Sequence, residues 1–193
     1  RLITTYLINS PLLLIESGVF YFKEEPMKNR NRKTIRLKTI RAVYETFNIE
    51  ADDFDPNSPI TNSGQVYELL KYLIDETKEH FITLHLDSKN KILAIDHVST
   101  GSMSANVVHP REVMKTALLS SAAALLCIHN HPSGNPDPSR EDIDITRRLN
   151  DAAEVMGLRL LDHVIVGDGC YVSFADRGLL ESSTSNQTLL IRA

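Results

Sequence analysis

One stretch constrains the fold more than any other: a short apolar run that ends in two histidines and leads through a turn into a helix. The run, residues 122–128, is bounded by polar residues and predicts a buried strand. His129 and His131 follow it, and because side chains two residues apart on a strand share one face, both imidazoles can point at one spot. Prolines and a glycine in residues 132–138 predict an irregular turn, and the helix after it carries Asp142 in its first turn.

Two imidazoles, one carboxylate and an open fourth position describe a catalytic zinc site. We therefore predict that His129, His131 and Asp142 bind zinc (Zn2+) and leave room for a water whose pKa the metal lowers. Cys127 would share the face of His129 one step deeper in the strand, which makes it a poor fourth ligand. A competing interpretation needs no metal, because Ser139 and Asp142 match a capping box, Ser-x-x-Asp. Capping alone does not explain two histidines at the end of a buried strand.

The rest of the chain predicts helices that alternate with strands around one sheet, an α/β fold. The predicted helices cover residues 62–75, 110–119 and 139–156. The predicted strands cover residues 81–86, 91–98, 122–128, 158–166 and 170–174, with turns at 87–90 and 167–169.

The composition of the 193 residues is that of an ordinary globular protein, with 42% apolar and 24% charged residues and enough length for one domain. The formal net charge of −4 argues against a general binder of polyanions. Cys127 and Cys170 both lie in apolar runs, so we predict two buried free thiols in a reducing cytoplasm. No apolar stretch reaches the roughly 20 residues that a membrane-spanning helix needs, so we expect no membrane partner.

The segment from His129 to Asp142 resembles the JAMM/MPN+ metalloprotease signature, His-x-His-x7-Ser-x2-Asp, and Ser139 fills its serine position. Residues from about 60 to 180 resemble the RadC-like family more closely. The matching stretches are Leu86-Asp87-Ser88-Lys89-Asn90, Val108-His109-Pro110-Arg111-Glu112, His129-Asn130-His131-Pro132-Ser133-Gly134-Asn135-Pro136 and Leu161-Asp162-His163. The resemblance implies a cytidine-deaminase-like (MPN) fold, with a central mixed sheet flanked by helices. It also implies zinc held by the two histidines and the aspartate, with water as fourth ligand.

The resemblance further implies catalytic residues around the metal. A glutamate from an upstream strand would act as general acid and base, and Glu79, just before the strand that begins at Phe81, is the position the resemblance suggests. Glu112 remains the alternative, because it lies near a predicted helix start, where the macrodipole favours a carboxylate. Ser139 would hydrogen-bond the developing oxyanion while it also caps its helix.

Two further histidines are left outside the predicted site. His163 lies in an apolar strand beside Asp162, so we interpret it as a core histidine with that carboxylate as its partner. His109 precedes a proline and is interpreted as a turn or cap residue.

The predicted domain organisation follows the resemblance. Residues 61–180 form the RadC-like hydrolase domain, residues 27–60 a basic and then acidic segment and linker, and residues 181–193 a C-terminal tail. Residues 1–26 are interpreted as a fragment or mis-called upstream extension, because the chain starts at Arg1 and Met27 opens a more conventional polar start.

The predicted function is that of a zinc metallopeptidase with a peptide or isopeptide substrate. The alternative is a nucleic-acid-associated accessory protein with a structural or inactive metal site, supported by the lysines and arginines of residues 28–41. A third hypothesis is a metal-free interaction domain. Many full-length relatives carry an N-terminal helix-hairpin-helix module, and residues 27–60 are too short to supply one, which weakens a DNA-repair role.

Overall fold

The computed structural model describes residues 13–16, 19–22, 43–46, 48–49, 54–101 and 108–180. The chain divides into two compact units, residues 1–41 and 42–193. In the first unit, strands β1 (Leu13–Glu16) and β2 (Val19–Phe22) form an antiparallel pair. The basic residues 28–41 and the C-terminal tail, 181–193, lie outside the described residues, so the nucleic-acid alternative and the tail boundary stay predictions.

The second unit holds a five-stranded sheet in the order β4-β3-β5-β6-β7. Its strands are β3 (Glu79–Leu86), β4 (Ile92–Gly101), β5 (Ala124–Asn130), β6 (Arg159–Val166) and β7 (Tyr171–Ser173). Its helices are α1 (Ser63–Leu70), the 3-10 helix η1 (Lys71–Asp75), α2 (Pro110–Leu119) and α3 (Arg140–Val155). None of the helices in the described ranges is long and apolar enough to cross a membrane.

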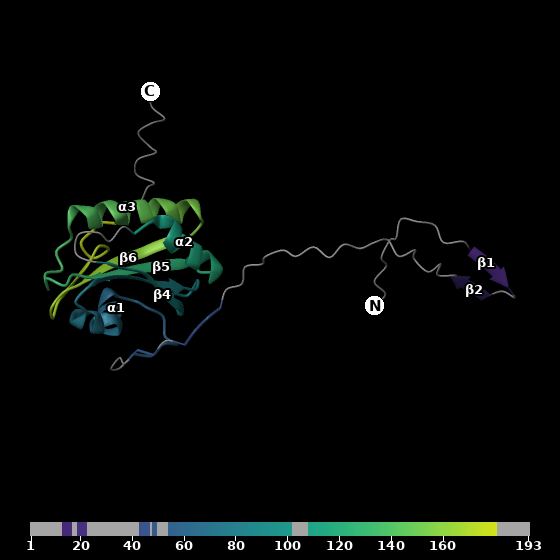
Figure 1. The fold of residues 1–193 in the computed structure, drawn as a ribbon, viewed down its shortest axis with the longest axis horizontal. Helices are drawn as coiled ribbons and strands as arrows, with labels where there is room; N and C mark the ends of the chain where they lie inside the picture. Colours follow the sequence, from purple (N-terminus) through teal and green to yellow (C-terminus); the bar gives the residue numbers. More distant parts are fainter. Residues whose placement is uncertain are drawn as a thin grey trace, which may run out of the picture. The chain divides into compact units, whose positions relative to one another are not determined.

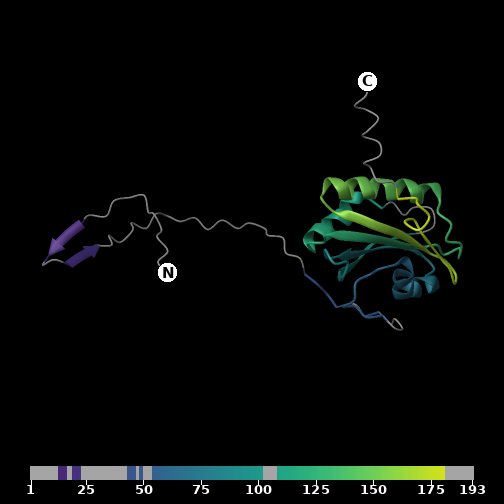
Figure 2. The same ribbon diagram turned by 180° about the vertical axis from the view of Figure 1, so that it is seen from behind.

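The sheet is mixed, as the resemblance implies, and helices flank it, which confirms the predicted α/β fold class. Strand β3 runs antiparallel to both β4 and β5, β5 runs parallel to β6, and β6 pairs antiparallel with β7. Parallel neighbours need a crossover connection, and α3 supplies it between β5 and β6. Figure 1 shows α2 and α3 on one face of the sheet and α1 on the other, and the view from behind in Figure 2 shows the same layers.

Each face of the sheet has its own hydrophobic core. Alternate residues of β3 and β5, such as Ile82 and Ile128, pack toward α1 and η1. The residues between them, such as Phe81 and Leu125, form the second core with apolar side chains of α2 and α3. Strand β5 is therefore buried along its whole length, which is why its sequence is a continuous apolar run rather than an alternating one.

The prediction of two buried thiols is correct for Cys127 and wrong for Cys170. Both are free, but Cys127 is buried and Cys170 is exposed. Cys170 lies in the turn between β6 and β7, outside both strands, where its carbonyl accepts a hydrogen bond from the Gly167 N–H. Burial raises the pKa of the Cys127 thiol well above its ordinary value.

Candidate metal centre

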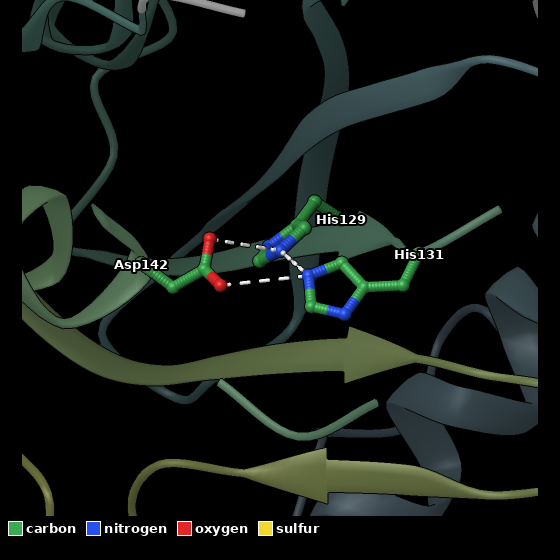
Figure 3. Close-up of side chains that lie close together, drawn as sticks. All are labelled: His129, His131 and Asp142. Carbon is green, nitrogen blue, oxygen red and sulfur yellow. Dashed lines mark hydrogen bonds and ion pairs between the residues drawn. The ribbon is translucent and has the colours of Figure 1, made fainter. Parts of the chain in front are cut away.

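The end of β5 and the start of α3 bring the three predicted ligands together (Figure 3). His129 is the second-last residue of β5. His131 lies one residue beyond the strand, where its N–H donates to the Val166 carbonyl at 2.9 Å and fixes the chain against the end of β6. Asp142 occupies the third position of α3, so its carboxylate lies at the helix N-terminus.

The ligand atoms of the three side chains all lie within 4.8 Å of one another. Nε2 of His129 is 3.2 Å from Oδ1 of Asp142, and Nε2 of His131 is 3.4 Å from Oδ2. The two Nε2 atoms are 3.0 Å apart. Among the described residues, this is the group of histidine, cysteine and acidic side chains that is close enough to hold a metal ion, and Cys127 does not belong to it.

A hydrogen bond on the far side of the His131 ring indicates that this donor set fits a cation. Nδ1 of His131 lies 2.7 Å from the Asn135 carbonyl oxygen, which carries no hydrogen, so Nδ1 must be the donor. A neutral His131 ring then presents the lone pair of Nε2 toward His129 and Asp142. Lone pairs and a carboxylate that face one point repel each other unless a positive charge lies between them, and two imidazoles with one carboxylate form a normal zinc ligand set.

The charges at this centre are strongly coupled. Burial alone would raise the pKa of the Asp142 carboxyl, but the neighbouring imidazoles of His129 and His131 and the Ser139 hydroxyl outweigh burial and hold that pKa well below its ordinary value. The Asp142 carboxylate raises the pKa of His131, burial of the ring opposes this, and the Asn135 carbonyl and the charge of Glu79 add to the increase. The site therefore attracts positive charge.

Ser139 caps α3 and also contacts the metal-site carboxylate. Its Oγ accepts from the Asp142 N–H at 3.1 Å, and its own N–H donates to Oδ2 of Asp142 at 2.7 Å, which completes the predicted capping box. The Ser139 hydroxyl also donates to Oδ2 at 2.6 Å. Capping and metal binding are thus compatible, because Ser139 holds the carboxylate in the orientation that faces the two imidazoles.

Glu79 is the first residue of β3 and is half-buried. Antiparallel pairing joins Phe81 to His129, so the residue two before Phe81 lies on the same sheet face and next to the position of His131. The side-chain amide of Asn130 fixes the backbone on both sides of Glu79. It accepts from the His80 N–H at 2.8 Å and donates to the Lys78 carbonyl at 3.0 Å.

Glu112 lies in the first turn of α2, as predicted, but it is engaged elsewhere. Its carboxylate lies 2.5 Å from Nζ of Lys115 and 3.4 Å from Nε of Arg111. The hydrogen bond from Lys115 lowers the pKa of Glu112. His109 is the N-cap residue of the same helix, although its side chain makes no capping hydrogen bond.

His163 is a core histidine, but its predicted partner is wrong. The Asp162 carboxylate accepts hydrogen bonds from the backbone N–H of His163 and Ala175 and from the Ser173 hydroxyl, not from the imidazole. The His163 ring instead lies 2.8 Å from Nδ1 of His129 and 2.6 Å from the Thr146 hydroxyl. The Leu-Asp-His stretch of the resemblance was the one sequence signal at this position, and it did not indicate which groups the ring contacts.

A family model described as a RadC-like JAB domain matches residues 60–179. The chain belongs to the RadC-like family. Its relatives include proteins named UPF0758 from Geotalea uraniireducens, 48% identical over 143 residues, and from Methanosarcina mazei, 46% identical over 144 residues. A UPF0758 protein from Trichlorobacter lovleyi is 54% identical over 121 residues.

The match to these RadC-like relatives covers 73%, 74% and 62% of this chain for the Geotalea, Methanosarcina and Trichlorobacter proteins. It covers 63%, 63% and 53% of the relatives' own lengths, in the same order. The chain thus spans a little over half the length of these relatives, and what the whole relatives do is a separate question from what the metal centre of this domain can do.

Proposed function

We propose that this RadC-like domain is a zinc-dependent hydrolase that cleaves peptide or isopeptide bonds. The observation that carries the proposal is the convergence of His129, His131 and Asp142 at one point, with no fourth histidine, cysteine or acidic side chain in the group among the described residues. A structural zinc site would normally close its shell with a fourth protein ligand, whereas a catalytic site keeps one position for water or substrate.

A zinc ion held by these side chains would supply a polarised carbonyl and a water of lowered pKa. Glu79 would take the proton from that water and deliver it to the leaving amine. Its half-buried position on the face of His129, and the effect of its charge on the pKa of His131, support this role. Glu112 is less suited, because Lys115 and Arg111 already engage its carboxylate.

Ser139 would have two tasks in this scheme. In the structure its single hydroxyl proton is donated to Asp142, so it orients a metal ligand. To stabilise an oxyanion, the hydroxyl must rotate from Asp142 toward the substrate oxygen, where one such donor contributes roughly 3–4 kcal/mol of transition-state stabilisation.

The test combines metal analysis with activity profiling. The purified chain is expected to hold about one zinc per molecule and to cleave members of a peptide and isopeptide library. Cleavage should stop with a chelator, return with zinc, and be absent in Asp142→Asn. Asp137→Asn is the matched control, because Asp137 lies before the same helix but pairs with Arg177. Stoichiometric zinc without cleavage of any substrate would contradict the hydrolase proposal and leave a binding role.

A further inference from the structure

We propose that His163 and Thr146 are positioning residues for the metal centre: a buried hydrogen-bond chain through them orients the His129 ring and directs its free lone pair to the metal. The inference rests on the metal-binding part of the proposed function. It concerns two residues that hydrogen-bond to the proposed ligands, His163 and Thr146, and neither belongs to the His-x-His-x7-Ser-x2-Asp signature.

This hydrogen-bond chain consists of three hydrogen bonds, and the residues at its two ends, His129 and Asp142, are both proposed metal ligands. Nδ1 of His129 lies 2.8 Å from Nε2 of His163, and Nδ1 of His163 lies 2.6 Å from Oγ1 of Thr146. The Thr146 hydroxyl lies 2.5 Å from the backbone carbonyl oxygen of Asp142. These hydrogen bonds therefore link His129 on β5 to Asp142 on α3 by a path through β6 that does not pass through the metal centre.

The direction of each hydrogen bond follows from the last acceptor. A carbonyl oxygen carries no hydrogen, so Thr146 must donate to Asp142 and accept from Nδ1–H of His163. A neutral His163 then has a bare Nε2, which can only accept, so His129 must donate from Nδ1–H. With its proton on Nδ1, the neutral His129 ring presents the lone pair of Nε2 toward Asp142 and His131, as a metal ligand requires.

Burial enforces this arrangement. His163 is 0% exposed, His129 1% and Thr146 2%, so water cannot replace a missing partner, and an unpaired polar group there costs about 1–3 kcal/mol. A charge on a ring this deeply buried would be costly, which favours the neutral form of His163. Phe174 stacks on His163 with ring centroids 4.9 Å apart, and Phe81 packs edge-on at 5.4 Å, so the ring is held from both sides.

A metal-bound histidine normally donates its other ring N–H to an oriented acceptor, and losing that acceptor typically lowers metal affinity by about 10–100-fold. His131 has a backbone carbonyl, that of Asn135, in this role. His129 has a side chain instead, so its acceptor can be removed by substitution. This difference makes the proposal testable.

The experiment measures the zinc dissociation constant of the whole chain by competition with a chromophoric chelator. His163→Leu removes the acceptor, and Thr146→Val removes only the hydroxyl that holds His163. We expect zinc binding to weaken by about 10–100-fold in His163→Leu and by a smaller factor in Thr146→Val. In the zinc-free wild type, nitrogen NMR of labelled histidine should show a proton on Nδ1 of His129, and in Thr146→Val a mixture of both tautomers.

A second buried histidine provides a matched control. His85 is 1% exposed on the same sheet face, and its ring lies 3.1 Å from the Thr83 hydroxyl and 2.9 Å from that of Ser120. It lies near the opposite end of β3 from Glu79. His85→Leu and Thr83→Val should lower the melting temperature as the site variants do, yet leave the zinc dissociation constant unchanged.

Zinc binding within about twofold of wild type in Thr146→Val and His163→Leu, with His129 keeping its tautomer, would overturn the inference. If His163→Leu fails to fold, Thr146→Val and the NMR spectrum decide alone. A wild-type chain that binds zinc but cleaves nothing would refute the proposed function and leave this inference standing. A wild-type chain that does not bind zinc would overturn both.

Discussion

Glu79 and Glu112 differ in the charges that surround them. The charge of Glu79 contributes to the raised pKa of His131, whereas the carboxylate of Glu112 forms an ion pair with Lys115. We predict that Glu79→Gln binds zinc normally but loses turnover by about 10²–10⁴-fold, the usual contribution of general acid–base catalysis. Glu112→Gln should stay near wild type, because it removes only a partly exposed surface pair. The measurement is kcat together with zinc content, and full activity in Glu79→Gln with loss in Glu112→Gln would reverse the assignment.

Asn130 holds the backbone on both sides of Glu79 through its side-chain amide. Asn130→Ala should leave the Lys78 carbonyl and the His80 N–H without this partner and cost about 1–3 kcal/mol of stability. We expect a lower kcat with zinc content unchanged, because Asn130 is not a ligand. Asn130→Asp keeps an acceptor for the His80 N–H but not the donor to the Lys78 carbonyl. Its kcat should therefore lie between those of the wild type and Asn130→Ala. A variant that is less stable yet turns over normally would limit Asn130 to a structural role.

The residues that could be predicted from the sequence are those whose geometry is local. The spacing of His129 and His131, and the position of Asp142 three residues after its N-cap, fix their relation within one strand–turn–helix segment. His163 and Asn130 act through groups distant in the chain, so their partners depend on strand register. No local pattern encodes that register, and the pairing assumed for His163 was wrong for this reason.

At the level of elements, the N-terminus of α3 serves both helix stability and the metal centre. Ser139→Ala removes the hydroxyl that caps the helix and contacts Asp142, so we predict a loss of about 1 kcal/mol of stability together with weaker zinc binding. Asn62→Ala is the matched control, since Asn62 caps α1 by accepting from the Gln65 N–H at 3.0 Å. Denaturant unfolding and zinc titration of both variants separate the two effects. Equal zinc affinity in both variants would mean that Ser139 does not orient the carboxylate.

The loop after β5 packs against the turn after β6, and Gly167 permits the contact. A Cβ at Gly167 would lie 2.5 Å from the Gly134 carbonyl oxygen and 2.7 Å from Cδ of Pro136. Gly167→Ala must therefore displace the loop whose Asn135 carbonyl orients His131, which we expect to cost about 1–3 kcal/mol and to weaken zinc binding. Gly169→Ala is the control, because its Cβ would meet nothing within 4 Å, although its φ of +65° adds local strain. Equal zinc affinity in Gly167→Ala and Gly169→Ala would contradict the prediction that the contact at Gly167 positions the loop that orients His131.

The sequence located the elements more reliably than their arrangement. The predicted helix over 110–119 coincides with α2, and the helix predicted over 62–75 is divided into α1 and the 3-10 helix η1. Period and capping signals act within an element, so they mark its position and type. Strand order and direction depend on contacts between elements, and here the mixed sheet was predicted from the family resemblance, not from periodicity.

At the scale of the whole domain, the metal centre joins parts of the fold that are otherwise linked by a long irregular turn. A zinc ion there would connect the end of β5 to the start of α3. The hydrogen bonds through His163 on β6 connect the same two elements. Binding to the folded state alone stabilises it by mass action. Zinc should therefore act on the stability of the entire domain and not only on the loop.

We predict that zinc raises the melting temperature and that the increase grows with pH. At free zinc about 100 times the dissociation constant, the gain is roughly 2.7 kcal/mol, or about 5–10 °C for a domain of this size. The pKa of His131 is raised in the metal-free fold, so its proton stabilises that fold below about pH 6.5, the unfolded value, and this stabilisation disappears as the pH rises through the folded pKa. Zinc must displace that proton, so its effect should be smaller at pH 6 than at pH 8. Differential scanning fluorimetry measures both, with Asp142→Asn as a control that should show no shift at either pH, and an equal shift at the two pH values would contradict the competition between zinc and the proton.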